Sequence, residues 1–266
     1  MKNNFVFFGS SPFSIFTLQK LKESSSLPSL IVTLPDQPRG RGMKIQPNVV
    51  KEWALNNNVS VLETEKLSES DLDKIKEYNP EVLLVVASGL FIPKIFLKEF
   101  ENKVLNLHPS LLPKYRGPSP LQNLILNNDL ENAGISLIVL DNQIDHGGIV
   151  ASQKYEGLWP TDMQNLGKNL FEIGAEIFVN NLDDFLSGKI KVIKQDDSLA
   201  TFTKKIEKSE GEINLEDNDF QNYLKYLAYT LWPGIFYFED GKRVKIKRAD
   251  FKDNRFVVRE KIVVNN

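Results

Sequence analysis

The feature that most constrains the fold is a series of short, mostly apolar runs that end in small or polar residues. Phe5–Phe8 stops at Gly9, and comparable runs cover 30–34, 82–86 and 104–107. These runs are too short for helices, and helical spacing fills the stretches between them. Strands that are apolar on both faces and alternate with helices are typical of a parallel sheet. We therefore expect an α/β, Rossmann-like fold, with a mostly parallel sheet and helices on both of its faces.

The pattern changes in the last quarter of the chain. The longest helical pattern covers 166–186, and beyond Thr201 one more helix precedes short segments in which polar and apolar residues alternate. Alternation indicates strands with one solvated face. We expect a catalytic domain over 1–195, a linker over 196–204 and a small β-rich domain over 205–266.

Composition excludes several kinds of site. The 266 residues include no cysteine, so disulfides, a thiolate nucleophile and cysteine-ligated metals are ruled out. His108 and His146 are the only histidines, which argues against a multi-histidine metal site, and we expect no metal. No run of about 18 apolar residues and no signal-peptide pattern occurs, so we expect a cytoplasmic protein without a membrane segment. The net charge of −2 is not that of a generally cationic protein.

One strand candidate ends in Asn106-Leu107-His108, which puts both polar side chains on the same side of the chain. Ligands of open α/β sheets bind beyond the carboxyl ends of strands. An amide donor and an imidazole that titrates near neutral pH would together hold and protonate an oxygen that becomes negative during acyl transfer. A capped, half-buried Asn106 and a surface His108 would explain the spacing equally well.

Two further segments belong to the same hypothesis. Pro109 and Pro113 bracket a stiff loop whose backbone groups could bind a flat heterocycle. Asp145 lies between the strand candidates 135–140 and 149–155, where a carboxylate could orient His108 and accept a proton through water. Aspartate and glycine are common in hairpins, and for this segment alone a hairpin turn is the stronger interpretation. His146 would then be a turn residue, or else line the mouth of a pocket.

A basic loop follows the second strand candidate. Arg39, Arg41 and Lys44 alternate with glycines between Pro35 and Lys44, which would suit contact with a phosphate backbone. The loop lacks the P-loop pattern, and Gly9-Ser10-Ser11 lacks the dinucleotide-binding pattern. A solvated surface loop is an equal alternative.

The C-terminal part carries a second basic segment. From Thr201 onward 13 basic residues outnumber 11 acidic ones. Alternation places Arg243, Lys245 and Lys247 on one face of a strand candidate, which suits an anionic partner. An edge strand protected by lysines is the competing interpretation.

Three motifs, in this order, resemble the formyltransferases that use 10-formyltetrahydrofolate. They are Asn106-Leu107-His108-Pro109-Ser110-Leu111-Leu112-Pro113, Tyr115-Arg116-Gly117 and Ile144-Asp145-His146-Gly147. Three more segments resemble the branch of that family that acts on methionyl-tRNA. They are the loop 35–42, the strand end 86–93 and Trp232-Pro233. The resemblance extends from about Phe5 to about Arg248.

The resemblance implies roles for particular residues. It implies a catalytic trio of Asn106, His108 and Asp145. It implies contacts with the folate from Ser88, Gly89, Leu90, Ser110, Leu111, Leu112, Pro113 and Asp141. It implies contacts with the tRNA from Arg39, Gly40, Arg41 and Lys44, to which the basic strand adds Arg243, Lys245 and Lys247.

The implied reaction transfers a formyl group from 10-formyltetrahydrofolate, as co-substrate, to the α-amine of methionine on initiator Met-tRNA. We expect a monomer. A formyltransferase for an amino-sugar nucleotide or another small amine is the main alternative, and a non-catalytic tRNA- or folate-binding protein is a second. The sequence departs from the family at Ser88, where relatives often carry tyrosine, and at His146, where many carry threonine. The family's C-terminal barrel is longer than 205–266, so we expect a truncated OB-like barrel.

Overall fold

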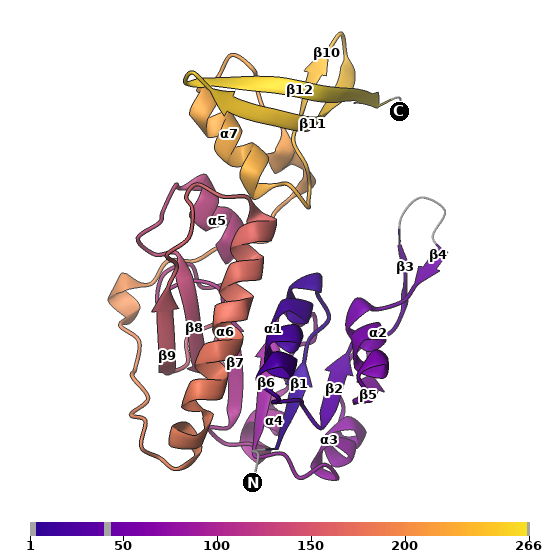
Figure 1. Cartoon of the computed structure of the whole chain (residues 1–266), viewed down its shortest axis with the longest axis vertical. Coiled ribbons are helices and arrows are strands. Elements are labelled where there is room, and N and C mark those ends of the chain that lie inside the picture. Colours follow the sequence, from indigo (N-terminus) through magenta and orange to yellow (C-terminus); the bar gives the residue numbers. More distant parts are fainter. Residues whose placement is uncertain (1–3, 40–43, 265–266) are drawn as a thin grey trace.

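The computed structural model describes residues 4–39 and 44–264. Its larger part is a seven-stranded sheet with the order β5-β2-β1-β6-β7-β8-β9 (Figure 1). The strands are β1 Phe5–Phe8, β2 Leu30–Thr33, β5 Ser60–Glu63, β6 Val82–Val86, β7 Val104–His108, β8 Gly134–Val139 and β9 Ile149–Lys154. The first five in this order are parallel, whereas β8 and β9 run antiparallel to their neighbours. The mostly parallel α/β sheet expected from the sequence is confirmed.

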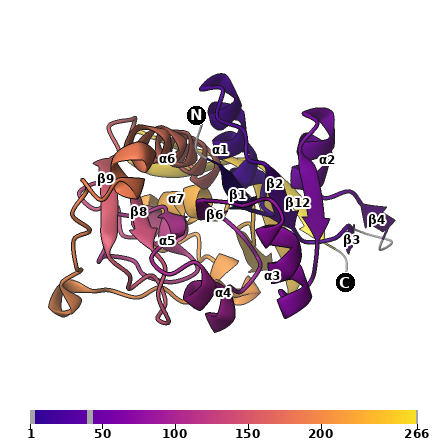
Figure 2. The same cartoon turned by 90° about the horizontal axis from the view of Figure 1, so that it is seen from below.

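Helices cover both faces of this sheet (Figure 2). They are α1 Pro12–Glu23, α2 Val49–Asn56, α3 Glu69–Lys76, α4 Lys94–Glu99, α5 Pro120–Leu126 and α6 Met163–Leu186. Strand β6 shows why its sequence is apolar throughout. Leu84 packs in the cluster that includes α1 and α6, whereas Leu83 and Val85 pack in the cluster of α3 and α4. None of the helices in the described residues is long and apolar enough to cross a lipid bilayer.

A small antiparallel sheet with the order β10-β11-β12 forms the C-terminal part. Its elements are α7 Asp219–Ala228, β10 Phe236–Glu239, β11 Lys242–Lys252 and β12 Arg255–Val264. Helix α7 packs against β11 and β12 on one side and against α5 on the other. The β-rich part is therefore confirmed. The described residues form an open three-stranded sheet and do not close it into a barrel.

The basic loop is a hairpin. Strands β3 Gln37–Arg39 and β4 Lys44–Gln46 pair antiparallel, with Arg39 opposite Lys44, and project from the body of the molecule beyond α2 (Figure 1). Strands of three residues, one of which contains a proline, leave too little pattern to be recognised in the sequence. Gly40 and Arg41 lie outside the described residues.

Segment 187–218 joins the two sheets and contains two short 3₁₀ turns, Asp197–Leu199 and Lys208–Gly211. Part of it is attached to the large sheet domain. The N–H of Arg116 donates to the carbonyl of Thr201, and the N–H of Thr203 donates to the carbonyl of Arg116. The linker expected at 196–204 is therefore hydrogen-bonded to the segment around Arg116.

Candidate active site

Strand β7 places two polar side chains on one face of the sheet. Leu105 and Leu107 point into the apolar cluster on the α1 and α6 side, so the alternating residues Asn106 and His108 face the opposite side. The backbone of Asn106 is paired on both sides of the strand, and its side chain is half-buried. His108 is 4% exposed. The two side chains therefore lie as the spacing predicts.

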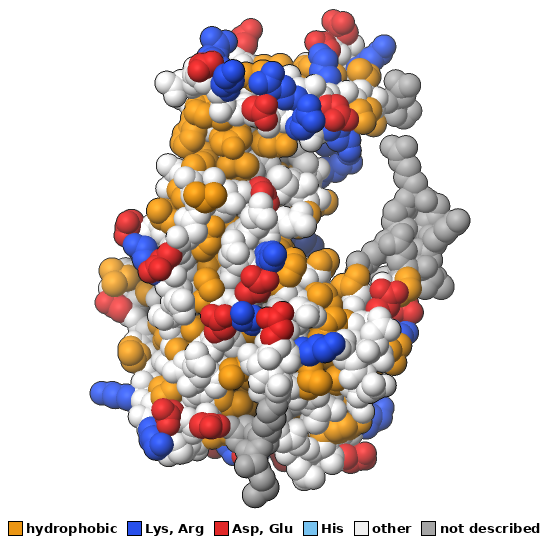
Figure 3. Space-filling model, viewed as in Figure 1, with side chains coloured by type: hydrophobic (Ala, Val, Ile, Leu, Met, Phe, Trp, Pro, Cys, Tyr) orange, Lys and Arg blue, Asp and Glu red, His pale blue; other side chains and the backbone are white. Residues whose placement is uncertain are grey.

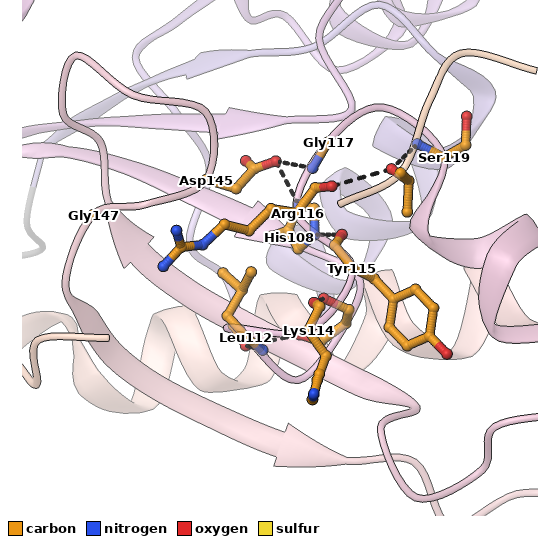
Figure 4. Close-up of polar contacts among 12 residues, drawn as sticks. His108, Leu112, Lys114, Tyr115, Arg116, Gly117, Ser119, Asp145 and Gly147 are labelled. Carbon is orange, nitrogen blue, oxygen red and sulfur yellow. Dashed lines mark hydrogen bonds and ion pairs between the residues drawn. The ribbon is translucent and has the colours of Figure 1, made fainter. Parts of the chain in front are cut away.

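His108 is held in one tautomer by Tyr115. Its Nε2 lies 2.9 Å from the Tyr115 carbonyl oxygen (Figure 4). A carbonyl only accepts hydrogen bonds, so Nε2 carries the proton. The other ring nitrogen, Nδ1, lies 3.5 Å from Oδ2 of Asp145. That contact is attractive when Nδ1 is also protonated, which makes the ring a cation beside a carboxylate.

Tyr115 itself is anchored at its far end. Its hydroxyl donates to Oδ2 of Asp129 at 2.6 Å. Burial, followed by this hydrogen bond, raises the pKa of Tyr115 to about 12. The hydroxyl therefore remains a donor at neutral pH and fixes the residue whose carbonyl orients His108.

Asp145 reaches His108 from the loop between β8 and β9, here called the 140–148 loop. The loop starts at the opposite end of β7, where the N–H of Leu140 donates to the carbonyl of Val104. It then runs back along the sheet face to Asp145, whose φ is +49°. The carboxylate accepts a hydrogen bond of 2.8 Å from the N–H of Gly117. A Cβ at Gly147 would lie 1.7 Å from a backbone carbonyl oxygen, so only glycine fits that position.

Two cavities meet at this site. The loop cavity, of about 240 Å³, is lined by Val85, Leu90, Phe91, Ile92, Lys94, Leu97, Asn106 and residues 140–145. The proline cavity, of about 370 Å³, is lined mainly by Ser88, Asn106, His108, Pro109, Gly117, Pro118, Pro120 and Asp145, with apolar side chains of α1 and α6. Asn106 and Asp145 belong to both walls. Two molecules bound on either side would therefore meet at an amide and a carboxylate.

Comparison with known proteins shows which family this chain resembles. Residues 3–182 match the formyl transferase family, and residues 205–259 match the C-terminal domain of formyl transferases. The methionyl-tRNA formyltransferase of Caldicellulosiruptor saccharolyticus is 36% identical over 92% of this chain and 79% of its own length. That of Sulfurihydrogenibium is 35% identical over the same shares. The chain belongs to the methionyl-tRNA formyltransferase family.

Solved structures share the fold of this methionyl-tRNA formyltransferase family member. A methionyl-tRNA formyltransferase from Clostridium thermocellum superimposes with a TM-score of 0.67 at 21% identity, covering 99% of this chain and 100% of that one. An N-formyltransferase from Helicobacter canadensis, solved in complex with folinic acid and dTDP-3-aminofucose, gives a TM-score of 0.69 at 17% identity, covering 98% of this chain and 100% of that one. The resemblance to formyltransferases drawn from the motifs is therefore confirmed.

The residues predicted to contact folate fall into three groups. Leu90 and Asp141 line the loop cavity, and Ser88 lines the proline cavity. Gly89 lines neither cavity, and its N–H donates to the hydroxyl of Ser10. The folate contacts of all four residues stay predictions, and the position of Gly89 favours support of the strand end instead.

Segment Ser110–Pro113 lines neither cavity. Ser110 is fully buried, and its hydroxyl donates to the carbonyl of Lys114. The hydroxyl of Ser136 donates to the carbonyl of Ser110 and accepts from the N–H of Leu112. These contacts shape the turn that presents Tyr115 to His108. A direct folate contact from this segment stays a prediction.

Gly40 and Arg41 of the predicted tRNA residues lie outside the described part of the chain, and the others lie away from the trio. The side chains of Arg39 and Lys44 are not described, and Lys245 and Lys247 line a separate cavity at the end of α7. Arg243 stacks on the Phe236 ring at 3.5 Å from its centre. Basic and acidic side chains are mixed over the C-terminal sheet (Figure 3). Among the predicted tRNA residues whose side chains are described, Lys245 and Lys247 share a hollow that an anionic group could enter.

One network escaped the sequence reasoning. Arg116 is 3% exposed, and its Nε and Nη2 donate to Oε1 of Gln195, 79 positions away. Its Nη2 also donates to Asp197, and this hydrogen bond is the main cause that lowers the pKa of Asp197. His146 contacts Asp141 through Nδ1 at 2.5 Å and Asp197 through Nε2 at 3.4 Å. A single glutamine at the end of the predicted catalytic domain carries no sequence signal for such contacts. In the described part of the chain no three His, Asp or Glu side chains group as metal ligands do.

Proposed function

We propose that this protein transfers the formyl group of 10-formyltetrahydrofolate to the α-amine of methionine on initiator Met-tRNA. The observation that carries the proposal is the pair of cavities that share Asn106 and Asp145 as a common wall. Relatives named methionyl-tRNA formyltransferase, 31–36% identical over more than nine-tenths of the chain, support the choice of acceptor. The reaction would take place in the cytoplasm, with the protein acting as a monomer.

The loop cavity suits the ring end of the formyl donor. Val85, Leu90 and Leu97 offer apolar walls, and the polar backbone of the 140–148 loop forms the opposite side. Flat heterocycles bind in such places, because stacking on apolar groups combines with hydrogen bonds at the ring edge. The glutamyl end of the folate would extend past Phe91, which is 82% exposed at the rim. The proline cavity then remains for the methionine end of the acceptor.

The reaction needs no covalent enzyme intermediate. The free amine attacks the formyl carbon, a C–N bond forms, and the carbonyl oxygen becomes an oxyanion. We assign the Asn106 amide as its hydrogen-bond donor, a role typically worth about 3 kcal/mol of barrier. The proton lost by the amine passes to Asp145, directly or through water, and then to the folate nitrogen as the old C–N bond breaks. Bringing the two substrates into contact supplies much of the remaining acceleration.

We assign His108 an electrostatic role. Both of its ring nitrogens face acceptors, the Tyr115 carbonyl and the Asp145 carboxylate, so neither points freely at the substrate. As a cation the ring would stabilise the oxyanion at short range. This assignment narrows the sequence-based hypothesis, in which His108 could also protonate the oxyanion directly.

Recognition of the tRNA is assigned to two basic regions, the hairpin at 37–46 and the helix-end hollow with Lys245 and Lys247. If they bind the phosphate backbone, affinity for tRNA falls steeply with salt, because counterions are released on binding. The division into domains 1–195 and 205–266 belongs to this proposal as well, with the second domain adding the tRNA contacts.

The deciding experiment is a formyl-transfer assay with 10-formyltetrahydrofolate. Charged initiator Met-tRNA and a set of amino-sugar nucleotides are offered in parallel, since formyltransferases of both kinds share the fold. We expect formyl-Met-tRNA as the product, with a rate that falls as salt rises. Transfer to an amino-sugar nucleotide alone would replace the proposed acceptor. Folate binding without transfer to any amine would support a non-catalytic binding protein.

A further inference from the structure

The side-chain amide of Gln195 uses both of its ends inside the protein. Its Oε1 accepts two hydrogen bonds from Arg116, at 3.0 and 2.8 Å. Its Nε2 donates to the backbone carbonyls of Asp145 at 2.8 Å and Gly147 at 2.7 Å. The orientation is unambiguous, because a flipped amide would turn its NH₂ toward a guanidinium and its oxygen toward two carbonyls. Gln195 is 5% exposed and lines neither cavity.

These contacts hold residues 145–147, a stretch of the 140–148 loop that is strained and carries the Asp145 carboxylate. Asp145 has a left-handed φ of +49°, a conformation that costs free energy for a residue with a side chain. Its carboxylate must also remain close to His108, 3.5 Å away. The two hydrogen bonds from Gln195 to the carbonyls of residues 145 and 147 fix the backbone that orients this carboxylate. A loop released from them has freedom to move Asp145 away from the reacting centre.

Arg116 connects this contact to the other half of the site. Its neighbours along the chain are Tyr115, whose carbonyl holds His108, and Gly117, whose N–H holds the Asp145 carboxylate. The side chain of Arg116 then fixes Gln195, which holds the loop from outside. Residues 115–117 thereby position His108 once, through the Tyr115 carbonyl. They position Asp145 twice, through the Gly117 N–H and through the contact of Arg116 with Gln195.

We infer that Gln195, fixed by Arg116, is a positioning residue for Asp145, and that the last residue of the predicted catalytic domain, next to the linker, is part of the catalytic apparatus. The inference rests on the proposed function for its effect on turnover, but the contact itself is independent of it. Gln195 touches neither substrate cavity, so its effect should fall on kcat and leave the KM of both substrates nearly unchanged.

The test compares Gln195→Ala and Gln195→Glu with Gln153→Ala as control. Gln153 is an exposed glutamine on β9. Gln195→Glu keeps an acceptor for Arg116 but cannot donate to the two carbonyls. Both Gln195 variants should lose about 10- to 100-fold in kcat, the range expected when a reacting group is displaced by about 1 Å. The control should retain wild-type kcat.

Hydrogen exchange supplies a readout that does not depend on activity. In both Gln195 variants, amides of residues 139–148 should exchange faster, while β1, β2 and β6 keep wild-type protection. Faster exchange throughout the protein would indicate a general structural role and overturn the inference, as would unchanged kcat with unchanged exchange. A tenfold rise in KM with normal kcat would indicate a substrate contact and overturn it too. If the wild type formylates no amine, the proposed function fails, and the exchange pattern still decides the positioning role.

Discussion

The two halves of the candidate site are built by different means. Asn106 and His108 stand on β7, a strand in the middle of the sheet that pairs with β6 and β8. Asp145 stands on a loop and depends on contacts with Gly117 and Gln195, which are 28 and 50 positions away. A strand holds its side chains through a backbone ladder that many residues share. A loop of this kind has only a few bonds to lose, so the two halves should respond differently to mutation.

The largest effect is expected at the strand. Asn106→Ala removes the proposed oxyanion donor and should lower kcat about 100- to 1,000-fold. The free energy of unfolding should change little, because the side chain is half-buried at a cavity wall. Steady-state kinetics and thermal unfolding measure the two quantities. Asn180→Ala, at an exposed position on α6, is the control, and wild-type turnover in Asn106→Ala would remove this residue from the mechanism.

Asp145→Asn tests the loop half without changing its shape. Asparagine tolerates the left-handed backbone, so the loop should persist while the proton acceptor is lost. We expect kcat to fall about 100-fold. Asp253→Asn is a matched control, because Asp253 also has a positive φ, of +52°, in the turn between β11 and β12. A loss of activity equal to that of the control would argue that Asp145 carries no proton.

Gly147→Ala should destabilise the loop half of the site and leave the strand half folded. The added Cβ would collide with the Val139 carbonyl oxygen, so the loop must shift, and we expect the free energy of unfolding to fall by about 1–3 kcal/mol. Turnover should fall with it, whereas the secondary structure of the protein as a whole should persist by circular dichroism. Gly188→Ala meets no neighbouring atom but introduces strain at a φ of +73°, so it shows the cost of an added Cβ without a collision. Wild-type stability of Gly147→Ala would mean that the close contact at residue 147 is unimportant.

The smallest expected effect is the loss of stability on removing the Tyr115 hydroxyl, which anchors the residue whose carbonyl orients His108. Tyr115→Phe removes the short hydrogen bond to Asp129 and the 3.4 Å hydrogen bond from Asn127, and should cost about 1 kcal/mol of stability at neutral pH. The pKa of Tyr115 is about 12 in the folded protein against 10.0 ordinarily, so the stabilisation it reports is complete below pH 10 and is lost as pH rises toward 12. The stability difference between wild type and variant should therefore shrink across that range in denaturant titrations. A constant difference up to pH 12 would contradict this origin of the shift.

The difference between the strand half and the loop half also explains which site residues could be predicted from the sequence. Asn106 and His108 were predictable because strand alternation alone puts them on one face. For the segment of Asp145, the hairpin interpretation is correct, since β8 and β9 do pair around it. The residues alone offered its approach to His108 only as the weaker interpretation, and the family resemblance was needed to favour it, because the loop doubles back along the sheet. The role of Gln195 depends on packing between distant segments, and no local pattern encodes it. The β3–β4 hairpin was missed because its strands are three residues long.

The shared wall of the two cavities has a kinetic consequence. Each cavity has its own lining and meets the other at Val85, Asn106 and Asp145, so neither substrate has to pass through the place of the other. Either one should be able to arrive first, and both must be present before any bond changes. Double-reciprocal plots at several fixed concentrations of the second substrate should therefore intersect, in contrast to the parallel lines of an enzyme that is itself formylated between two half-reactions.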